Sequence, residues 1–131
     1  MIVLDTSVMV ALVMNEPEAP QFRRRIQSGR ASLSACNYVE ASIVAEGRGG
    51  ALGRSAFEAV VAGLQAEGML LVALDPQMAE FAREGFRRYG KGRHPAGLNF
   101  GDCFAYALAK ALDAPLLYKG DDFDKTDVRR A

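Results

Sequence analysis

Short apolar runs that alternate with helical patterns are the feature that most limits how this 131-residue chain can fold. The runs are Met1–Leu4, "ASLSA" at 31–35, "MLLVAL" at 69–74 and "PLLY" at 115–118. Between them lie longer segments in which apolar residues recur three and four positions apart, as in amphipathic helices. Strands that alternate with helices form a parallel sheet with right-handed crossovers. We therefore predict an α/β fold, a single domain over residues 1–131 with a central, mostly parallel β-sheet flanked by α-helices.

Capping and turn residues indicate where the helices begin and end. The glycine-rich "GRGG" at 47–50 is expected to end one helix. Ser55 and Glu58 form a capping-box pattern that is expected to begin the next. The helices expected are 8–14, 16–28, 37–46, one beginning near Ser55, one beginning at Asp75–Pro76 and one from Asn99 to about Asp113.

Composition excludes several classes of protein. Half of the residues are hydrophobic and 24% are charged, which is ordinary for a domain that buries a core without disulfides. With His94 as the only histidine and two widely spaced cysteines, zinc-hydrolase and Ser-His-Asp sites have little to build on. No apolar run is long enough to span a membrane, and no signal-peptide pattern begins the chain. We therefore expect a cytoplasmic protein with no membrane partner.

Acidic residues occur at four places where predicted strands end or helices begin. Asp5 follows the first strand, Glu40 lies in the helix after the second, Asp102 lies in the first turn of a later helix, and Asp121 or Asp122 follows the last strand. In an open α/β sheet these positions meet at the carboxyl edge, where ligands bind. Carboxylate oxygens are the ligands that hard divalent cations prefer. The sequence therefore predicts a pair of metal ions that supports in-line attack on a phosphodiester.

Each acid also has an ordinary structural explanation. Asp5 can cap a helix, and Asp102 gains up to about 1 kcal/mol from the helix dipole. Glu40 can complete a capping box with Asn37, and aspartates such as Asp121 are common in turns. Their joint occurrence favours a site. Glu40 favours it most, because a carboxylate on an inward-facing helical stripe is costly unless it is paired or bound to metal.

Basic residues do not outnumber acidic ones in this chain, but several of them are clustered in one segment. The chain has 16 basic and 16 acidic residues, yet five basic residues and one acid lie between Arg83 and Arg93. A basic segment beside an acidic pocket fits a polyanion whose scissile phosphate is held by metal. We expect Arg87, Lys91 and Arg93 to contact this polyanion, with a solvated helix face as the ordinary alternative.

Four motifs, in this order, closely resemble those of PIN-domain ribonucleases, specifically the VapC-type toxins of bacterial toxin–antitoxin pairs. They are "VLDTSV", "NYVEAS", "LNFGDCFAYALA" and "LLYKGDDFDKTDV". The resemblance implies a PIN domain in which Asp5, Glu40 and Asp102 are catalytic metal ligands. It assigns Asp121 as the fourth acid, with Asp122 as the alternative. Thr6 and Ser7 match hydroxyl residues that help to hold the first aspartate or a metal-bound water.

The resemblance also implies an activity and partners. Family members are Mg²⁺- or Mn²⁺-dependent endoribonucleases that attack structured RNA such as transfer or ribosomal RNA, by a two-metal mechanism. Each is usually neutralised by a cognate VapB-type antitoxin whose C-terminal segment wraps over the active site. We expect a homodimer, and an antitoxin helix docked on apolar positions around Met14 and Phe22.

Two other functions are weighed against this one. A non-catalytic RNA-binding domain that keeps the PIN fold is disfavoured by the intact acidic set. A receiver-like phosphoacceptor domain would need an acidic pair after the first strand, where only Asp5 stands.

Overall fold

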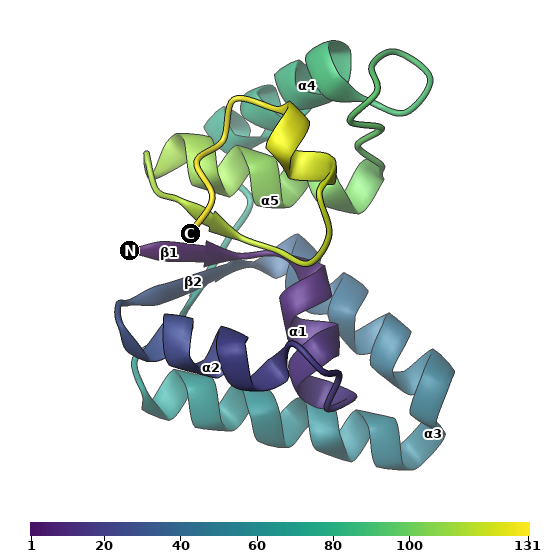
Figure 1. Ribbon diagram of the computed structural model, residues 1–131, viewed down its shortest axis with the longest axis vertical. Coiled ribbons are helices and arrows are strands. Elements are labelled where there is room, and N and C mark those ends of the chain that lie inside the picture. Colours follow the sequence, from purple (N-terminus) through teal and green to yellow (C-terminus); the bar gives the residue numbers. More distant parts are fainter.

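A computed structural model describes all 131 residues and shows helices on both faces of one sheet (Figure 1). This confirms the predicted α/β fold. A short 3₁₀ helix, η1, follows the last strand at Asp122–Lys125. The strands are β1 (Ile2–Leu4), β2 (Ala31–Ser34), β3 (Leu70–Val72) and β4 (Leu116–Leu117); the helices are α1 (Thr6–Val13), α2 (Ala19–Gln27), α3 (Ala35–Ala66), α4 (Pro76–Tyr89) and α5 (Phe100–Ala111).

The sheet is parallel throughout, with strand order β3-β2-β1-β4. The chain builds outward from β1 to β3 and then places β4 on the other side of β1. Ligands of open α/β sheets bind outside the carboxyl ends of the strands at such a reversal. Register pairs Leu4 with Leu33 and with Leu117, so Asp5 and Ser34 both come directly after aligned positions. The sheet therefore presents Asp5 at the edge where a site is expected.

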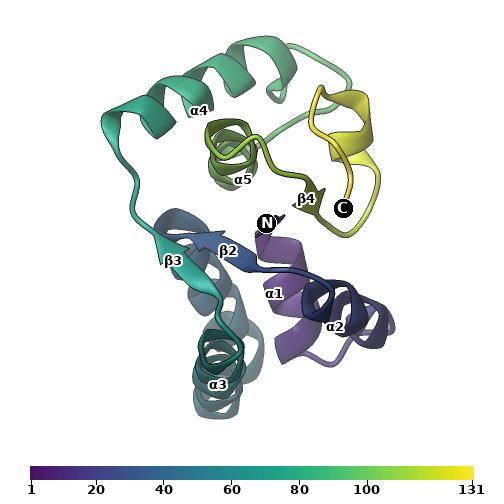
Figure 2. The ribbon, with the colours of Figure 1, turned by 90° about the vertical axis from the view of Figure 1, so that its left-hand side faces the viewer.

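Two hydrophobic cores lie on opposite faces of the sheet. One contains residues of α1, α2 and α3, and the other contains residues of α4 and α5, as Figure 2 shows from the side. Phe22 belongs to the first core with only 6% of its surface exposed, and Met14 packs against that core. The expected antitoxin-binding surface around Phe22 is therefore wrong. None of the helices is long and apolar enough to cross a membrane.

Helix α3 differs most from expectation. Instead of ending at "GRGG", it continues to Ala66, with non-helical backbone only at Gly50 (φ 57°, ψ −138°). Figure 1 shows the resulting corner. Ser55 lies inside the second half, so the predicted capping box there is wrong. Gly53 permits the corner, since a Cβ at this position would lie 2.1 Å from the carbonyl oxygen of Ala45.

Helices α4 and α5 begin where they were predicted, whereas α1 and α3 each begin two residues earlier than predicted. Asp75 Oδ1 accepts a hydrogen bond from Met78 N at 2.8 Å, and Pro76 occupies the first helical position of α4. Strand β3 is shorter than the apolar run that predicted it. Leu70 and Leu71 are 43% and 42% exposed because β3 is an edge strand.

Candidate functional site at the carboxyl edge of the sheet

Asp5 ends β1 and caps α1. Its Oδ2 accepts hydrogen bonds from Ser7 N at 3.0 Å and Ser7 Oγ at 2.6 Å. The side chain is buried, and its other oxygen, Oδ1, has no partner in the protein. Burial raises the pKa of Asp5, and the charge of Glu40 raises it further. A buried acceptor without a donor is costly, so Oδ1 marks a place where a cation or donor is needed.

Glu40 lies in the second turn of α3 and lines one cavity together with Asp5. Thr6 Oγ1 donates a hydrogen bond to Glu40 Oε1 at 2.5 Å. Gly101 lets α5 approach this carboxylate, since a Cβ there would lie 1.9 Å from Glu40 Oε2. Ser34, not Asn37, caps α3, so the capping-box explanation of Glu40 is wrong.

Asn37 is a supporting residue that the sequence reasoning missed. Its side chain is fully buried, accepts from Ser34 Oγ at 2.6 Å, and donates to Thr6 Oγ1 and to the carbonyl of Gly101, both at 3.0 Å. One amide thereby joins α1, α3 and α5. Because Thr6 Oγ1 accepts from Asn37, its own proton is directed to Glu40. The sequence did contain one signal for this role: an amide side chain, Asn37, three positions before the inward-facing Glu40 in the same predicted helix.

Asp102 has both the capping role and the site position considered for it. Its backbone N–H donates to Asn99 Oδ1 at 2.9 Å, and its Oδ2 accepts from Asn99 N at 3.0 Å, which is a complete capping box. Burial raises the pKa of Asp102 to about 6, with smaller contributions from the charges of Asp5, Glu40 and Asp122. Three carboxylates therefore share one electrostatic environment.

One cavity of about 330 Å³ gathers most of the predicted site. It contains the three acids and the two hydroxyl residues named from the sequence, together with cations that were not predicted to line it. Its lining consists of Asp5, Thr6, Ser7, Val10, Glu16, Glu40, Val44, Arg48, Asn99, Asp102 and Lys119.

Both candidates for the predicted fourth acid lie outside this lining. Asp121, which directly precedes η1, and Asp122, the first residue of η1, are both exposed. Only Asp122 contributes to the raised pKa of Asp102. The assignment of Asp121, with Asp122 as the alternative, stays a prediction.

The predicted RNA-contacting residues lie on α4 and the loop after it, away from the acidic cavity. Arg87 forms an ion pair with Glu84 at 2.5 Å, and the Arg93 guanidinium stacks over Phe86 at 5.4 Å from the ring centroid. Lys91 is exposed. Their contact with RNA stays a prediction.

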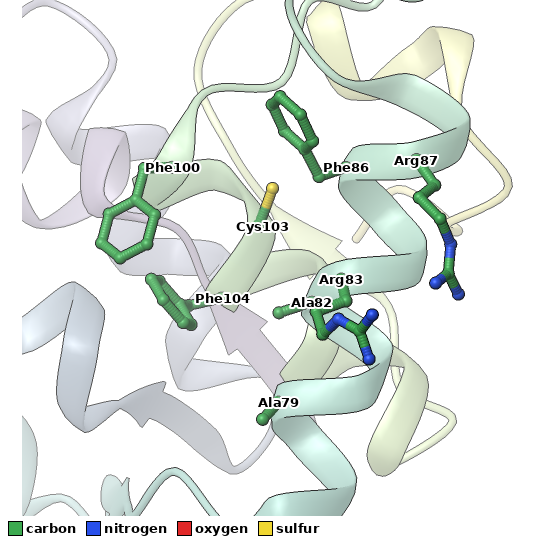
Figure 3. Close-up of a pocket in the computed structure, with 8 residues that line it drawn as sticks. All are labelled: Ala79, Ala82, Arg83, Phe86, Arg87, Phe100, Cys103 and Phe104. Carbon is green, nitrogen blue, oxygen red and sulfur yellow. The ribbon is translucent and has the colours of Figure 1, made fainter.

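A larger apolar groove of about 630 Å³ runs between the packed helices α4 and α5. Figure 3 shows the rings of Phe100 and Phe104 next to each other on α5, with Phe86 on α4 lying apart from them, beyond Cys103. The groove contains no carboxylate, so it offers no ligands for a hard cation. Its lining is Ala79, Ala82, Arg83, Phe86, Arg87, Phe100, Cys103 and Phe104.

The donor set at the acidic cavity fits Mg²⁺ or Mn²⁺ by its chemistry. No three His, Cys, Asp or Glu side chains are arranged as a ready ligand set for one metal ion. However, Asp5 Oδ1 is buried without a partner, and the pKa values of Asp5 and Asp102 are both raised. These features indicate that the negative charge of the carboxylates is not compensated within the protein. A divalent cation held by carboxylate oxygens would compensate it.

Comparison with known proteins identifies the family. A family model described as the PIN domain matches residues 2–129. Over 127 residues the chain is 42% identical to VapC ribonuclease Mb0640 of Mycobacterium bovis, covering 96% of this chain and 95% of the relative. It is 44% identical over the same length to ribonuclease VapC of Mycolicibacterium smegmatis, covering 96% of each. The chain therefore belongs to the PIN-domain family, and within that family to the VapC ribonucleases.

Two solved structures share the fold. The Mycobacterium tuberculosis VapC20 structure, described as a Sarcin-Ricin loop cleaving toxin, aligns with a TM-score of 0.78 at 17% identity and covers 100% of this chain and 98% of its own. A toxin–antitoxin complex from Klebsiella pneumoniae aligns with a TM-score of 0.70 at 13% identity, covering 97% and 93%. The family and the fold together set aside the receiver-like alternative.

Proposed function

We propose that this protein is a metal-dependent endoribonuclease and the toxin of a VapBC-type toxin–antitoxin pair. The observation that carries the proposal is the gathering of Asp5, Glu40 and Asp102 around one cavity in which Asp5 Oδ1 is buried without a partner. Membership of the VapC ribonucleases supports the ribonuclease activity. The metal dependence rests on the carboxylates themselves.

The chain's own residues hold the acids in place for this chemistry. Ser7 fixes one oxygen of Asp5 and leaves the other to the cavity, while Thr6 fixes Glu40. Asn99 fixes Asp102 through the capping box. Carboxylates held this way need no rearrangement to act as ligands. Two Mg²⁺ or Mn²⁺ ions, held by Asp5, Glu40, Asp102 and Asp121 or Asp122, would supply an activated water and stabilise the leaving oxygen.

The proposed substrate is structured RNA of the transfer or ribosomal class. The solved relative VapC20 is described as cleaving the Sarcin-Ricin loop, which supports a structured substrate. We propose that Arg87, Lys91 and Arg93 contact backbone phosphates of the same RNA at a distance from the scissile phosphate. Replacing all three with alanine should weaken RNA binding and reduce its salt dependence, because phosphate contacts release counterions. If the triple variant bound RNA like wild type across a salt titration, the basic segment would be only a solvated helix face.

The proposed partners are a VapB-type antitoxin and a second copy of the chain. The complex from Klebsiella pneumoniae supports a protein partner for this fold. Since Phe22 is buried, the groove between α4 and α5 is a more suitable apolar surface for an antitoxin helix. Expression of the chain alone should arrest bacterial growth, and co-expression of the antitoxin should restore it. Light scattering of the purified protein tests the proposed homodimer, for which the measured mass should be twice that of the chain.

Cleavage of RNA by the purified protein tests the activity. Wild-type protein should cut total bacterial RNA in Mg²⁺ or Mn²⁺ and not in EDTA, leaving 5′-phosphate ends. Asp5→Asn serves as the matched control, because it keeps the side-chain shape and removes the charge. Undiminished cleavage in EDTA would overturn the metal dependence. RNA binding without cleavage in either metal would favour the non-catalytic alternative.

A further inference from the structure

Arg48 lines the acidic cavity, and the proposed chemistry leaves it without a role. It follows Glu40 and Val44 at intervals of four residues on α3, which places the three side chains on one face of the helix. All three line the cavity. The sequence reasoning took Arg48 only as part of a turn.

The charge of Arg48 is not compensated within the protein. Two cations line the cavity, and the other one, Lys119, is paired with Glu16 at 3.1 Å and Glu18 at 3.3 Å. No ion pair of the structure includes Arg48. Four carboxylates line the same cavity, yet none lies within ion-pair distance of the guanidinium. A free guanidinium is therefore available to an anion that enters beside the acids.

The helix gives Arg48 a defined position. The preceding turns are anchored by Ala41 and Ala45, which are buried in the core, and the helical backbone is interrupted only at Gly50, two residues later. Divalent cations held by the carboxylates would attract phosphate oxygens, and guanidinium groups bind phosphate through paired N–H donors. A nucleic-acid backbone offers consecutive phosphates that suit both groups at once.

We propose that Arg48 binds the RNA substrate, with its guanidinium on a backbone phosphate next to the scissile one. The inference rests on the proposed ribonuclease function and adds a specific substrate contact on α3. The competing structural explanation is that a cation near the end of a helical segment gains from the helix dipole. That explanation predicts an effect on stability and none on RNA binding.

The test compares Arg48→Gln and Arg48→Lys with Arg23→Gln. Arg23 is exposed on α2, has no ion pair and does not line the cavity, so its variant controls for loss of one surface charge. RNA affinity is measured by fluorescence anisotropy over a salt series in the cleavage-deficient Asp102→Asn background, and KM and kcat are measured in the active background. The melting temperature of each variant is also recorded.

Arg48→Gln should weaken RNA binding and raise KM about tenfold, while Arg23→Gln leaves both near wild type. The slope of log affinity against log salt should fall in magnitude by about 0.7–0.9, the range for one phosphate contact to single-stranded or duplex nucleic acid. Arg48→Lys should be intermediate, since lysine keeps the charge and loses the paired donors.

The outcomes separate this inference from the function on which it rests. If wild type cleaves RNA while Arg48→Gln matches Arg23→Gln in affinity and KM, the inference is overturned and the ribonuclease stands. A lower melting temperature with unchanged RNA affinity also overturns it, in favour of the helix-dipole role. Failure of the wild type to cleave any RNA overturns both.

Discussion

At the scale of single residues, Asp5 and Asn37 show two ways of burying a polar group. Asn37 is fully buried with both ends of its amide paired, so its burial costs little. Asp5 is also buried, yet its Oδ1 has no donor and its pKa is raised. The hydrogen bonds of Asn37 form the frame that positions α1, α3 and α5 around the site. Asp5 has an unpaired oxygen in that site, which needs a cation or a hydrogen-bond donor.

Removing the Asn37 amide should loosen this frame. Asn37→Ala removes the acceptor of the Ser34 hydroxyl and the donor to Thr6 Oγ1 and to the carbonyl of Gly101, so we expect a loss of about 3 kcal/mol in the free energy of unfolding. Urea denaturation measures the loss. Thr6→Val is a useful comparison, since it breaks only the Thr6 contacts with Asn37 and Glu40. A loss below about 0.5 kcal/mol for Asn37→Ala would show that water replaces the amide.

Which of these residues the sequence reveals depends on how local their signal is. Asp5 and Asp102 were predicted because each stands beside a strand end or a helix cap. The role of Asn37 depends on partners in α1 and α5, 31 and 64 residues away, so no pattern near it reports the contacts. Arg48 was missed because glycines on both sides of it indicated a turn.

At the scale of elements, α4 and α5 could be predicted and α3 could not, for a physical reason. Asp75 and Asn99 cap helices with their own side chains, which is a local signal. The glycines after Glu46 lower helix propensity without forbidding a helix, and tertiary packing decides the outcome. In α3 the packing of Gly53 against Ala45 holds the two halves together around Gly50.

Alanine substitutions at two glycines of α3 should change the free energy of unfolding in opposite directions. At Gly53 a Cβ would lie 2.1 Å from the Ala45 carbonyl oxygen, so Gly53→Ala should cost about 1–3 kcal/mol. Gly63 has nothing within 4 Å of that position, so Gly63→Ala should gain about 0.5–1 kcal/mol through helix propensity. Chemical denaturation of both variants measures the free energy of unfolding. If Gly53→Ala were as stable as Gly63→Ala, the close crossing of the two halves would be wrong.

At the scale of the whole molecule, the acidic cavity should couple folding to pH. The pKa of Asp102 is about 6 in the fold against an ordinary 3.8, so the folded state binds this proton more tightly than the unfolded chain. The contribution of Asp102 to stability is therefore complete below pH 3.8, the pKa in the unfolded chain, and is lost as pH rises through about 6. Asp124 and Asp127 have lowered pKa values and therefore titrate below this window.

We expect the metal-free protein to melt at a higher temperature near pH 5 than near pH 7. Asp102→Asn should show a smaller difference between these two conditions, because it removes the titrating group and keeps the shape of the side chain. Circular dichroism melts in the presence of EDTA provide the comparison. Equal differences for wild type and variant would mean that Asp102 titrates normally.

The central claim is that Asp5, Glu40 and Asp102 together hold a divalent cation, and Mn²⁺ titration followed by calorimetry tests it most directly. The account predicts that wild type binds Mn²⁺ and that Asp5→Asn and Asp102→Asn each bind it at least about tenfold more weakly while remaining folded. Arg23→Gln should bind like wild type, since Arg23 does not line the cavity. Absence of Mn²⁺ binding by folded wild type, or equal binding by the two asparagine variants, would contradict the account.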